Sequence, residues 1–382
     1  MLFNQIIGQE HLKNHLKVSV EKGRIPHAQL FVAEQGRGAL PMAIAYAQFL
    51  LCNFSENVER CNLQCNKLQH PDLHFAFPVT TNESVKKHAV SNLFLEDWRK
   101  FISEKPYGGL FDWLQYIGVE NKQALIGVDE AEDIVNKLKL KSYEGGFKVM
   151  IIWMAEKMNT TAANKLLKLI EEPPAKTVFL LVVEDESQLI NTIKSRCQAL
   201  HFPPLSEQDI TTALIKNEHC TESDAIKCAH QAAGNYNKAL HLLHNSTNDL
   251  QFEQWFITWI RSAFRAKGNA TVVEDLIMWS NEISASGRET QKQFLLYCLH
   301  FFRQALLLNY QADELVFLET QTPKFDIKNF APFVHGNNIL SIEKELNNAL
   351  YHIERNGNAK IILLDLSMKL TRFLHVKESL LD

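Results

Sequence analysis

The segment from Ala33 to Leu40 has the position of a phosphate-binding loop but lacks the side chains that bind phosphate. It lies between a predicted strand, residues 29–32, and a predicted helix, residues 41–51, which is the setting of the G-x-x-x-x-G-K-[ST] motif. In a working loop the lysine contacts the β- and γ-phosphates, and the next hydroxyl holds Mg²⁺. Ala39 and Leu40 occupy those two places, so the chain is not expected to hydrolyse ATP.

Two glycines remain in this loop, Gly36 and Gly38, with Arg37 between them. Successive backbone N–H groups in such a turn can form an anion-binding nest. A Gly-x-Gly after a strand is also common as a plain tight turn. We interpret these three residues as a vestigial phosphate loop, in which passive nucleotide binding is not expected.

The predicted strand at residues 148–152 leads to the same conclusion. A hydrolytic phosphate-loop protein has acidic residues at the end of such a strand, for the metal shell and for the attacking water. Trp153 and Met154 follow the strand here and can perform neither task. The apolar strand also fits the buried interior of a parallel sheet, and both interpretations agree that no ATP is hydrolysed.

Arg196 is a cation whose chemistry would suit a phosphate group. It lies in the motif Ser195-Arg196-Cys197, after a predicted strand at residues 178–183. A guanidinium is permanently charged and offers a rigid fork of donors, which suits the negative charge of a phosphoryl-transfer transition state. An ion pair with a carboxylate of the same domain is the alternative, and the residues alone leave it open.

Longer motifs carry a family resemblance. They are Ile7-Gly8-Gln9-Glu10, Arg24-Ile25-Pro26-His27-Ala28, Ala162-Ala163-Asn164-Lys165-Leu166-Leu167-Lys168, Glu171-Glu172-Pro173-Pro174 and Ser195-Arg196-Cys197. With these motifs the chain resembles the delta prime family of bacterial clamp-loader subunits, AAA+ proteins of the DNA polymerase III holoenzyme. The resemblance runs nearly from end to end.

The resemblance implies an α/β fold, in which an AAA+ doubly wound parallel sheet of the P-loop type is followed by a small helical lid domain and an all-α collar domain. The expected domains are residues 1–203, 204–248 and 249–382. Apolar runs separated by amphipathic segments independently favour a parallel sheet covered on both faces. These runs lie at residues 29–32, 73–77, 148–152, 178–183 and 199–202.

The resemblance also implies a function. Members of the family act as non-hydrolysing stators in a hetero-oligomeric ring with gamma/tau motor subunits and a delta subunit, and this clamp loader meets the sliding clamp and primer-template DNA. Arg196 is then an arginine finger that enters the ATP site of a neighbouring subunit. The segment from Ala233 to Leu240 resembles the second AAA+ sensor, in which Asn237, beside Lys238, replaces an arginine.

Two other function classes stay open at this point. An active AAA+ ATPase motor is opposed by Ala39, Leu40, Trp153 and Met154. A zinc-stabilised interaction scaffold outside replication leaves the motif around Arg196 unexplained.

Cys52, Cys61 and Cys65 lie in a polar segment, residues 52–74, where the resembled family carries a four-cysteine zinc module. A structural zinc site takes four ligands and commonly includes a C-x₂₋₄-C element, a spacing that Cys61 and Cys65 provide. The fourth cysteine is missing, so His70 or His74 would have to complete the shell. Three leftover thiols without metal are the alternative.

Residues 80–125 form an insertion longer than the resemblance leads us to expect. Its amphipathic part contains Phe94, Trp98 and Phe101. These aromatic side chains could form a partner surface, but we favour a helical insertion that packs back on the core.

The length and net charge of the chain limit how many domains it forms and which partners it binds on its own. A chain of 382 residues predicts two or three domains, and its net charge of −4 gives no reason to expect strong DNA binding by the chain alone. The longest apolar run, residues 178–183, is far below the ~20 residues that span a bilayer. We expect a cytoplasmic protein with no membrane contact, whose seven cysteines are reduced thiols.

Overall fold

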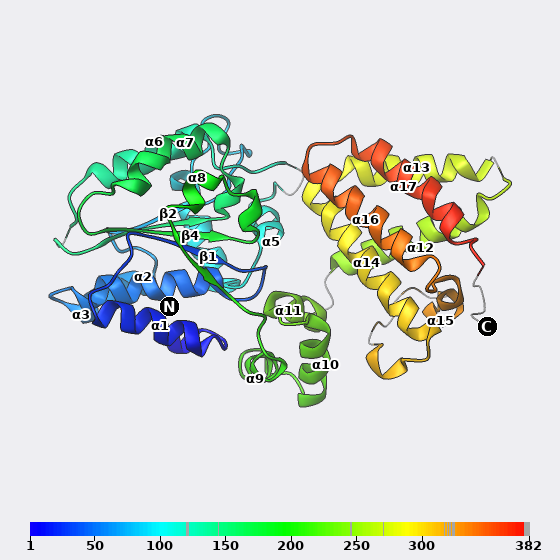
Figure 1. Ribbon diagram of the computed structural model, residues 1–382, viewed down its shortest axis with the longest axis horizontal. Helices are drawn as coiled ribbons and strands as arrows, with labels where there is room; N and C mark the ends of the chain where they lie inside the picture. Colours follow the sequence, from blue (N-terminus) through cyan, green and yellow to red (C-terminus); the bar gives the residue numbers. More distant parts are fainter. Residues whose placement is uncertain are drawn as a thin grey trace. The chain divides into compact units, whose positions relative to one another are not determined.

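The computed structural model describes residues 1–119, 122–143, 145–244, 247–269, 271–316, 318, 320, 322 and 325–377. The chain forms two compact units, one of residues 1–119 and 124–243 and the other of residues 120–123 and 244–382 (Figure 1). The expected division of the first unit into a sheet domain and a lid domain at residue 203 stays a prediction, as does the boundary at residue 248. No helix in the described part of the chain is both long and apolar enough to span a bilayer.

A five-stranded sheet organises the first unit, and every pairing in it is parallel. In spatial order the strands are β2 (Leu73–Ala76), β3 (Lys148–Trp153), β4 (Thr177–Val183), β1 (Ala28–Val32) and β5 (Gln198–His201). Val32 pairs with Val183, and Trp153 pairs with Val182. The carboxyl ends of β1, β3 and β4 therefore meet at one edge of the sheet, where a ligand site of an open parallel sheet is expected.

Helices cover both faces of this sheet, which confirms the predicted α/β class. Leu30 and Phe31 are neighbours on β1 but belong to separate apolar clusters, because successive side chains of a strand point to opposite faces. The cluster of Phe31 includes residues of α1, α2, α3, α4 and α5, and the cluster of Leu30 includes residues of α6, α7 and α8. The helices are α1 (Glu10–Glu21), α2 (Ala39–Asn53), α3 (Val58–Asn66), α4 (Leu95–Glu104), α5 (Leu110–Tyr116), α6 (Val128–Lys139), α7 (Thr160–Glu171) and α8 (Asn191–Lys194).

The insertion at residues 80–125, of which 120 and 121 lie outside the described residues, contributes α4 and α5. Trp98, Phe101 and Trp113 from these helices are fully buried. The Trp98 ring stacks on Phe77, with 4.1 Å between the ring centroids. The insertion therefore packs back on the core, and these aromatic side chains are not a partner surface.

Three lid helices complete the first unit: α9 (Glu207–Glu218), α10 (Glu222–Ala232) and α11 (Tyr236–His244). The side chains of Ser206 and Thr221 cap the first two helices by accepting hydrogen bonds from the backbone N–H groups of Asp209 and Asp224. The lid helices share a small apolar cluster that also includes Tyr107 of the insertion. The lid is thus tied to the insertion by apolar contact.

The longer described elements of the second unit are helices, as the spacing of its aromatic residues predicted. The helices are α12 (Thr247–Arg265), α13 (Thr271–Ala285), α14 (Arg288–Asn309), α15 (Ile327–Phe330), α16 (Ile339–Glu354) and α17 (Ala359–Phe373). Most of the aromatic stripe of α12 is buried, and Trp259 stacks on Trp279 with ring centroids 5.1 Å apart. Phe264 is the exception, since 40% of it is exposed.

Candidate functional site

The predicted phosphate loop connects β1 to α2 at the carboxyl edge of the sheet. Gly36 and Gly38 both have positive φ, +74° and +95°, a region that side-chain-bearing residues rarely adopt. The Ala33 N–H donates to the carbonyl of Val183, 3.0 Å away, which fixes the start of the loop to β4. The loop keeps the backbone shape of a turn that could face an anion.

The lid lies directly on this loop. The N–H of Tyr236, at the start of α11, donates to the Gly36 carbonyl over 3.1 Å. A Cβ atom added at Gly36 would lie 1.8 Å from Oδ1 of Asn235. That oxygen also accepts from the Lys238 N–H at 2.9 Å, so the same side chain caps α11 and covers the loop.

The insertion covers the loop from another side through Tyr107. Its hydroxyl accepts a hydrogen bond of 2.8 Å from the Ile7 N–H, and its ring packs against Tyr236 with 5.1 Å between centroids. A Cβ atom at Gly38 would lie 3.1 Å from the Tyr107 ring. Burial raises the pKa of Tyr107, so this phenol stays neutral.

The space left beside the loop is a cavity of about 30 Å³. Loop residues, Tyr107, Trp153, Met154 and Glu184 contribute to its walls. Pockets that bind small ligands typically have volumes of ~300–1,000 Å³, and one water needs roughly 10–15 Å³. In this conformation the cavity has room for water but not for a nucleoside triphosphate.

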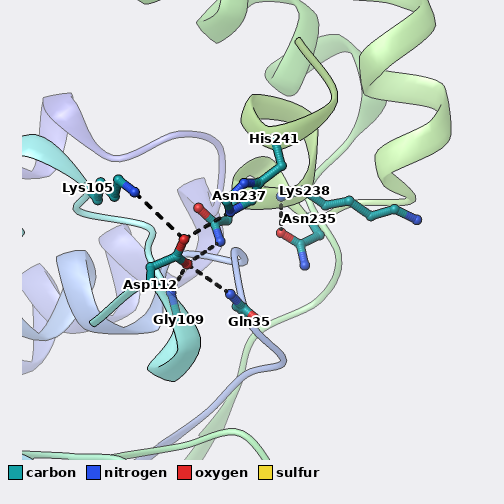
Figure 2. Close-up of polar contacts among 8 residues, drawn as sticks. All are labelled: Gln35, Lys105, Gly109, Asp112, Asn235, Asn237, Lys238 and His241. Carbon is teal, nitrogen blue, oxygen red and sulfur yellow. Dashed lines mark hydrogen bonds and ion pairs between the residues drawn. The ribbon is translucent and has the colours of Figure 1, made fainter. Parts of the chain in front are cut away.

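The carboxylate of Asp112 joins the insertion to the lid (Figure 2). Asp112 is almost fully buried in α5, and its Oδ2 accepts from the Gly109 N–H and from Nδ2 of Asn237, both at 2.8 Å. Nε2 of His241 lies 3.0 Å from Oδ1, and Nζ of Lys105 lies 3.9 Å from it. Figure 2 shows Asn237 and His241 pointing from α11 toward Asp112.

Burial alone would raise the pKa of Asp112, but the hydrogen bond and charge of His241, together with Gly109 and Asn237, outweigh it and lower the pKa. The carboxylate is therefore ionised and acts as an acceptor for both the lid and the insertion. Gln35 of the loop adds a long contact of 3.4 Å. Asp112 was not among the residues predicted from the sequence, whereas Asn237 was.

The predicted second-sensor residues thus have structural partners within the chain. Asn237 is buried and donates to Asp112, and Lys238 points away from that carboxylate (Figure 2). Arg37 of the loop forms an ion pair of 2.5 Å with Glu34, and its carbonyl accepts from Gln9 at 3.2 Å. Each of these polar groups is engaged with its own chain.

Trp153 and Met154 end β3 at the cavity, as the sequence placed them. Trp153 packs on Trp98, with ring centroids 5.1 Å apart. The nearby carboxylate of Glu156 accepts from the Glu184 N–H at 3.0 Å, and burial raises the pKa of Glu156. This half-buried acid contacts backbone and was not predicted as a site residue.

Arg196 lies just after α8, away from the loop contacts described above. Its Nη1 donates to the Thr192 carbonyl at 2.8 Å, and its Nε lies 3.2 Å from Oε2 of Glu171. About a third of the Arg196 side chain is exposed, and the Glu171 side chain is more exposed still. In the chain alone, Arg196 therefore forms the local ion pair that the sequence left open as an alternative.

Ser195 and Cys197 flank this arginine. The Ser195 hydroxyl donates to the Thr192 carbonyl at 3.2 Å, and burial raises the pKa of Cys197 to about 11. The Ser195 hydroxyl therefore holds the motif in place, and the thiol of Cys197 stays protonated and unreactive.

The three predicted cysteines come together, buried between α2 and α3. Cys52 and Cys61 form a disulfide, and the Cys65 sulfur lies 3.9 Å and 4.0 Å from the other two. The expectation that all cysteines are reduced thiols is therefore wrong for this pair. The sulfur atoms of all three cysteines lie within 4.8 Å of one another, so the three residues form a group that could hold a metal.

Neither predicted histidine belongs to this cysteine group. The Nδ1 atom of His70 accepts from the Asp72 N–H at 3.2 Å. Burial and the charges of Lys137 and Lys148 lower the pKa of His74 to about 4. A tetrahedral structural zinc needs four ligands, so the three sulfurs, two of them joined, do not complete such a site.

The sequence model of the family described as "DNA polymerase III, delta subunit" matches residues 8–206. A DNA polymerase III subunit delta' from Bacillus subtilis (strain 168) is 31% identical over 205 residues, covering 52% of this chain and 49% of that protein. The chain spans about half the length of this relative.

Two further relatives show the same range of similarity. The delta' subunit of Escherichia coli (strain K12) is 26% identical over 232 residues, covering 59% of this chain and 57% of that protein. A DNA polymerase III subunit tau from Bacillus subtilis (strain 168) is 26% identical over 214 residues, covering 56% of this chain and 31% of that protein.

Proposed function

Because the chain belongs to the DNA polymerase III delta subunit family, we propose that it is a non-hydrolysing stator subunit of a clamp loader. The observation that carries this proposal is the cavity of about 30 Å³ beside the phosphate loop. Asn235 and Tyr107 fill the space that a nucleotide would need, and Ala39 and Leu40 offer no ligand for phosphate or Mg²⁺. The chain itself is not an ATPase.

Arg196 is the arginine finger of this proposal, and it acts on the ATP of a neighbouring motor subunit. Its ion pair with Glu171 is partly exposed, and exposed pairs of this kind contribute only ~0–1 kcal/mol. The phosphates of a neighbour's ATP can therefore draw the guanidinium from Glu171 at small cost. A finger contributes a factor of ~10³–10⁵ to phosphoryl transfer where it has been measured.

The partners follow from the same proposal. The motor subunits are of the gamma/tau kind, and a delta subunit completes a hetero-oligomeric ring. The ring opens the sliding clamp at primer-template DNA during replication. The second unit, with its helical bundle, is the collar through which this chain joins the ring.

The decisive experiment measures ATP hydrolysis by the chain alone and by the ring reconstituted with its motor subunits, clamp and primed DNA. We expect no turnover by the chain alone and a loss of ring turnover in Arg196→Ala. Lys194→Ala is the matched control, because Lys194 is a cation on the neighbouring short helix α8 and pairs with Glu186 at 3.0 Å.

Turnover by the isolated chain would overturn the stator and favour the active motor instead. Full ring turnover in Arg196→Ala would overturn the finger assignment alone. If the chain fails to join the ring, the stator proposal is overturned, and the interaction scaffold outside replication becomes the remaining function class.

A further inference from the structure

The helical second unit contains a pocket that the proposed function does not use. It has a volume of about 390 Å³, and its lining residues come from α12 and from the segment between Phe325 and Phe333, which includes α15. Ile260 and Phe330, both buried, contribute to its floor. The volume lies at the lower end of ~300–1,000 Å³, the range of pockets that bind ligands, and fits one or two bulky side chains.

Two aromatic walls of the pocket are open to solvent. Phe264 is 40% exposed and Phe333 is 37% exposed, although most aromatic residues of this unit are buried. The two rings meet edge to face, with centroids 4.9 Å apart, and Phe264 stacks on His375 at 4.8 Å. These contacts fix both rings, so the pocket needs no rearrangement to accept an apolar group.

The rim of the pocket is basic. The guanidinium of Arg261 lies 5.8 Å from the centroid of the Phe325 ring. Arg265 follows one helical turn later, is exposed and forms no ion pair with any described residue. The only carboxylate of the lining is Asp326, which accepts from the Lys328 N–H at 2.9 Å and caps α15. The lining thus contains two arginines and one carboxylate, and of the arginines Arg265 is the exposed cation that carries the basic character of the rim.

The geometry points to this pocket as a docking site for a short segment of a partner protein, in which a bulky apolar side chain is flanked by carboxylates. The apolar side chain fills the space between Phe264 and Phe333, and a flanking carboxylate pairs with Arg265. Aromatic anchors in a preformed pocket with charged rims are the usual form of such a hot spot.

Single-stranded nucleic acid also binds arginine and aromatic residues, but it needs free ring faces for base stacking. Here Arg261 lies over the ring of Phe325, and His375 covers a face of Phe264. A peptide side chain that enters the pocket fits the remaining space better than a base.

The test uses the full chain and a hexapeptide with fluorescein on its amino terminus, an amidated carboxyl terminus and a central Leu-Trp pair between two aspartates on each side. Fluorescence anisotropy measures binding to the wild-type chain, Phe264→Ala, Arg265→Glu and the control Lys360→Glu, which reverses an exposed charge outside the pocket lining. We expect each pocket variant to weaken binding about tenfold or more and the control to leave it unchanged. Circular dichroism melts confirm that every variant is folded.

A second peptide with lysines in place of the aspartates should not bind measurably. Equal binding of both peptides, or binding that Phe264→Ala leaves unchanged, would overturn the proposal. An oligo-dT that competes for the pocket would assign it to nucleic acid instead. Self-association of the chain that disappears in Phe264→Ala would assign it to a second copy.

Discussion

Asp112 in α5 and His241 in α11 are joined over 3.0 Å, between Oδ1 and Nε2, although 129 residues separate them in the chain. This contact connects the insertion to the lid at the place where both cover the phosphate loop. Because the carboxylate is buried and several donors converge on it, the closed position of the lid depends on its charge.

Asp112→Asn should lower the free energy of unfolding by about 2–3 kcal/mol, since an amide leaves buried donors without an acceptor. Amide hydrogen exchange in α11 should become faster at the same time. The control is Asp129→Asn, whose partner His88 lies 2.7 Å away in an exposed pair, and it should cost about 1 kcal/mol or less. Equal costs in the two variants would show that the Asp112 contacts do not hold the lid.

Gly36→Ala should destabilise the first unit more than Gly23→Ala does. Both glycines have positive φ, so both variants carry the backbone cost of roughly 1–2 kcal/mol. Only at Gly36 would the new Cβ meet Asn235, and overpacking adds about 1–3 kcal/mol. Chemical denaturation measures both, and Asn235→Ala in the Gly36→Ala background should remove most of the extra cost.

The buried carboxyl of Glu130 should make the free energy of unfolding fall as pH rises. It is fully buried in α6, where one oxygen accepts from the Ser91 N–H and burial raises its pKa from 4.5 to about 7. The neutral folded form is favoured, so its contribution is complete below pH 4.5 and is lost as pH rises through about 7.

The comparison with Glu130→Gln isolates this effect, because glutamine has a similar shape and does not ionise. At about 1.4 kcal/mol per pKa unit, the wild-type chain should lose about 3 kcal/mol relative to the variant between acid and pH 8. Urea denaturation at several pH values measures the difference. A constant difference across this range would contradict the buried, neutral carboxyl.

The disulfide between Cys52 and Cys61 predicts how many free thiols the chain contains. Unreduced protein, denatured and titrated with a thiol reagent, should give five thiols per chain, which is the number of free cysteines. The same protein after reduction should give all seven. Elemental analysis should find no stoichiometric zinc, since the group offers only three sulfurs; one zinc per chain with seven thiols would contradict both statements.

Ala39→Lys should not produce ATP hydrolysis. Ala39 is buried at the start of α2, and Trp153 and Met154 supply no carboxylate for the metal. The new ammonium would be held in the protein without a partner, at a cost of about 3 kcal/mol or more. Turnover assays and thermal melts test both parts, and recovered hydrolysis would overturn our interpretation of the strand end.

The sequence predicted the sheet well because its strands are apolar runs with clear boundaries. All five predicted strands are present, and β3, for example, differs from its predicted range by the single residue Trp153. The segment between β1 and α2 also lies where the sequence placed it, because its neighbours are regular elements, while its interpretation as a vestigial phosphate loop stays a prediction. The local sequence pattern was sufficient to predict both the strands and the position of the loop.

The contacts that cover the loop could not be predicted in this way. Asp112 meets Asn237 and His241 only in the folded chain, and periodicity holds no information on such a distant pairing. One signal was present: Asp112 lies among Leu110, Trp113 and other apolar residues, and a carboxylate buried in such a helix needs partners. Nothing in the sequence named which partners they are.

The filled phosphate loop also constrains how this protein can evolve. A lysine at Ala39 would arrive buried and unpaired, a smaller residue at Tyr107 would leave a void, and a carboxylate at Trp153 would place a charge in the core. Each of these substitutions alone would lower the free energy of unfolding, and none of them alone would let the chain bind a nucleotide. Under the proposed function, a chain with this packing therefore has no route to nucleotide binding by a single substitution.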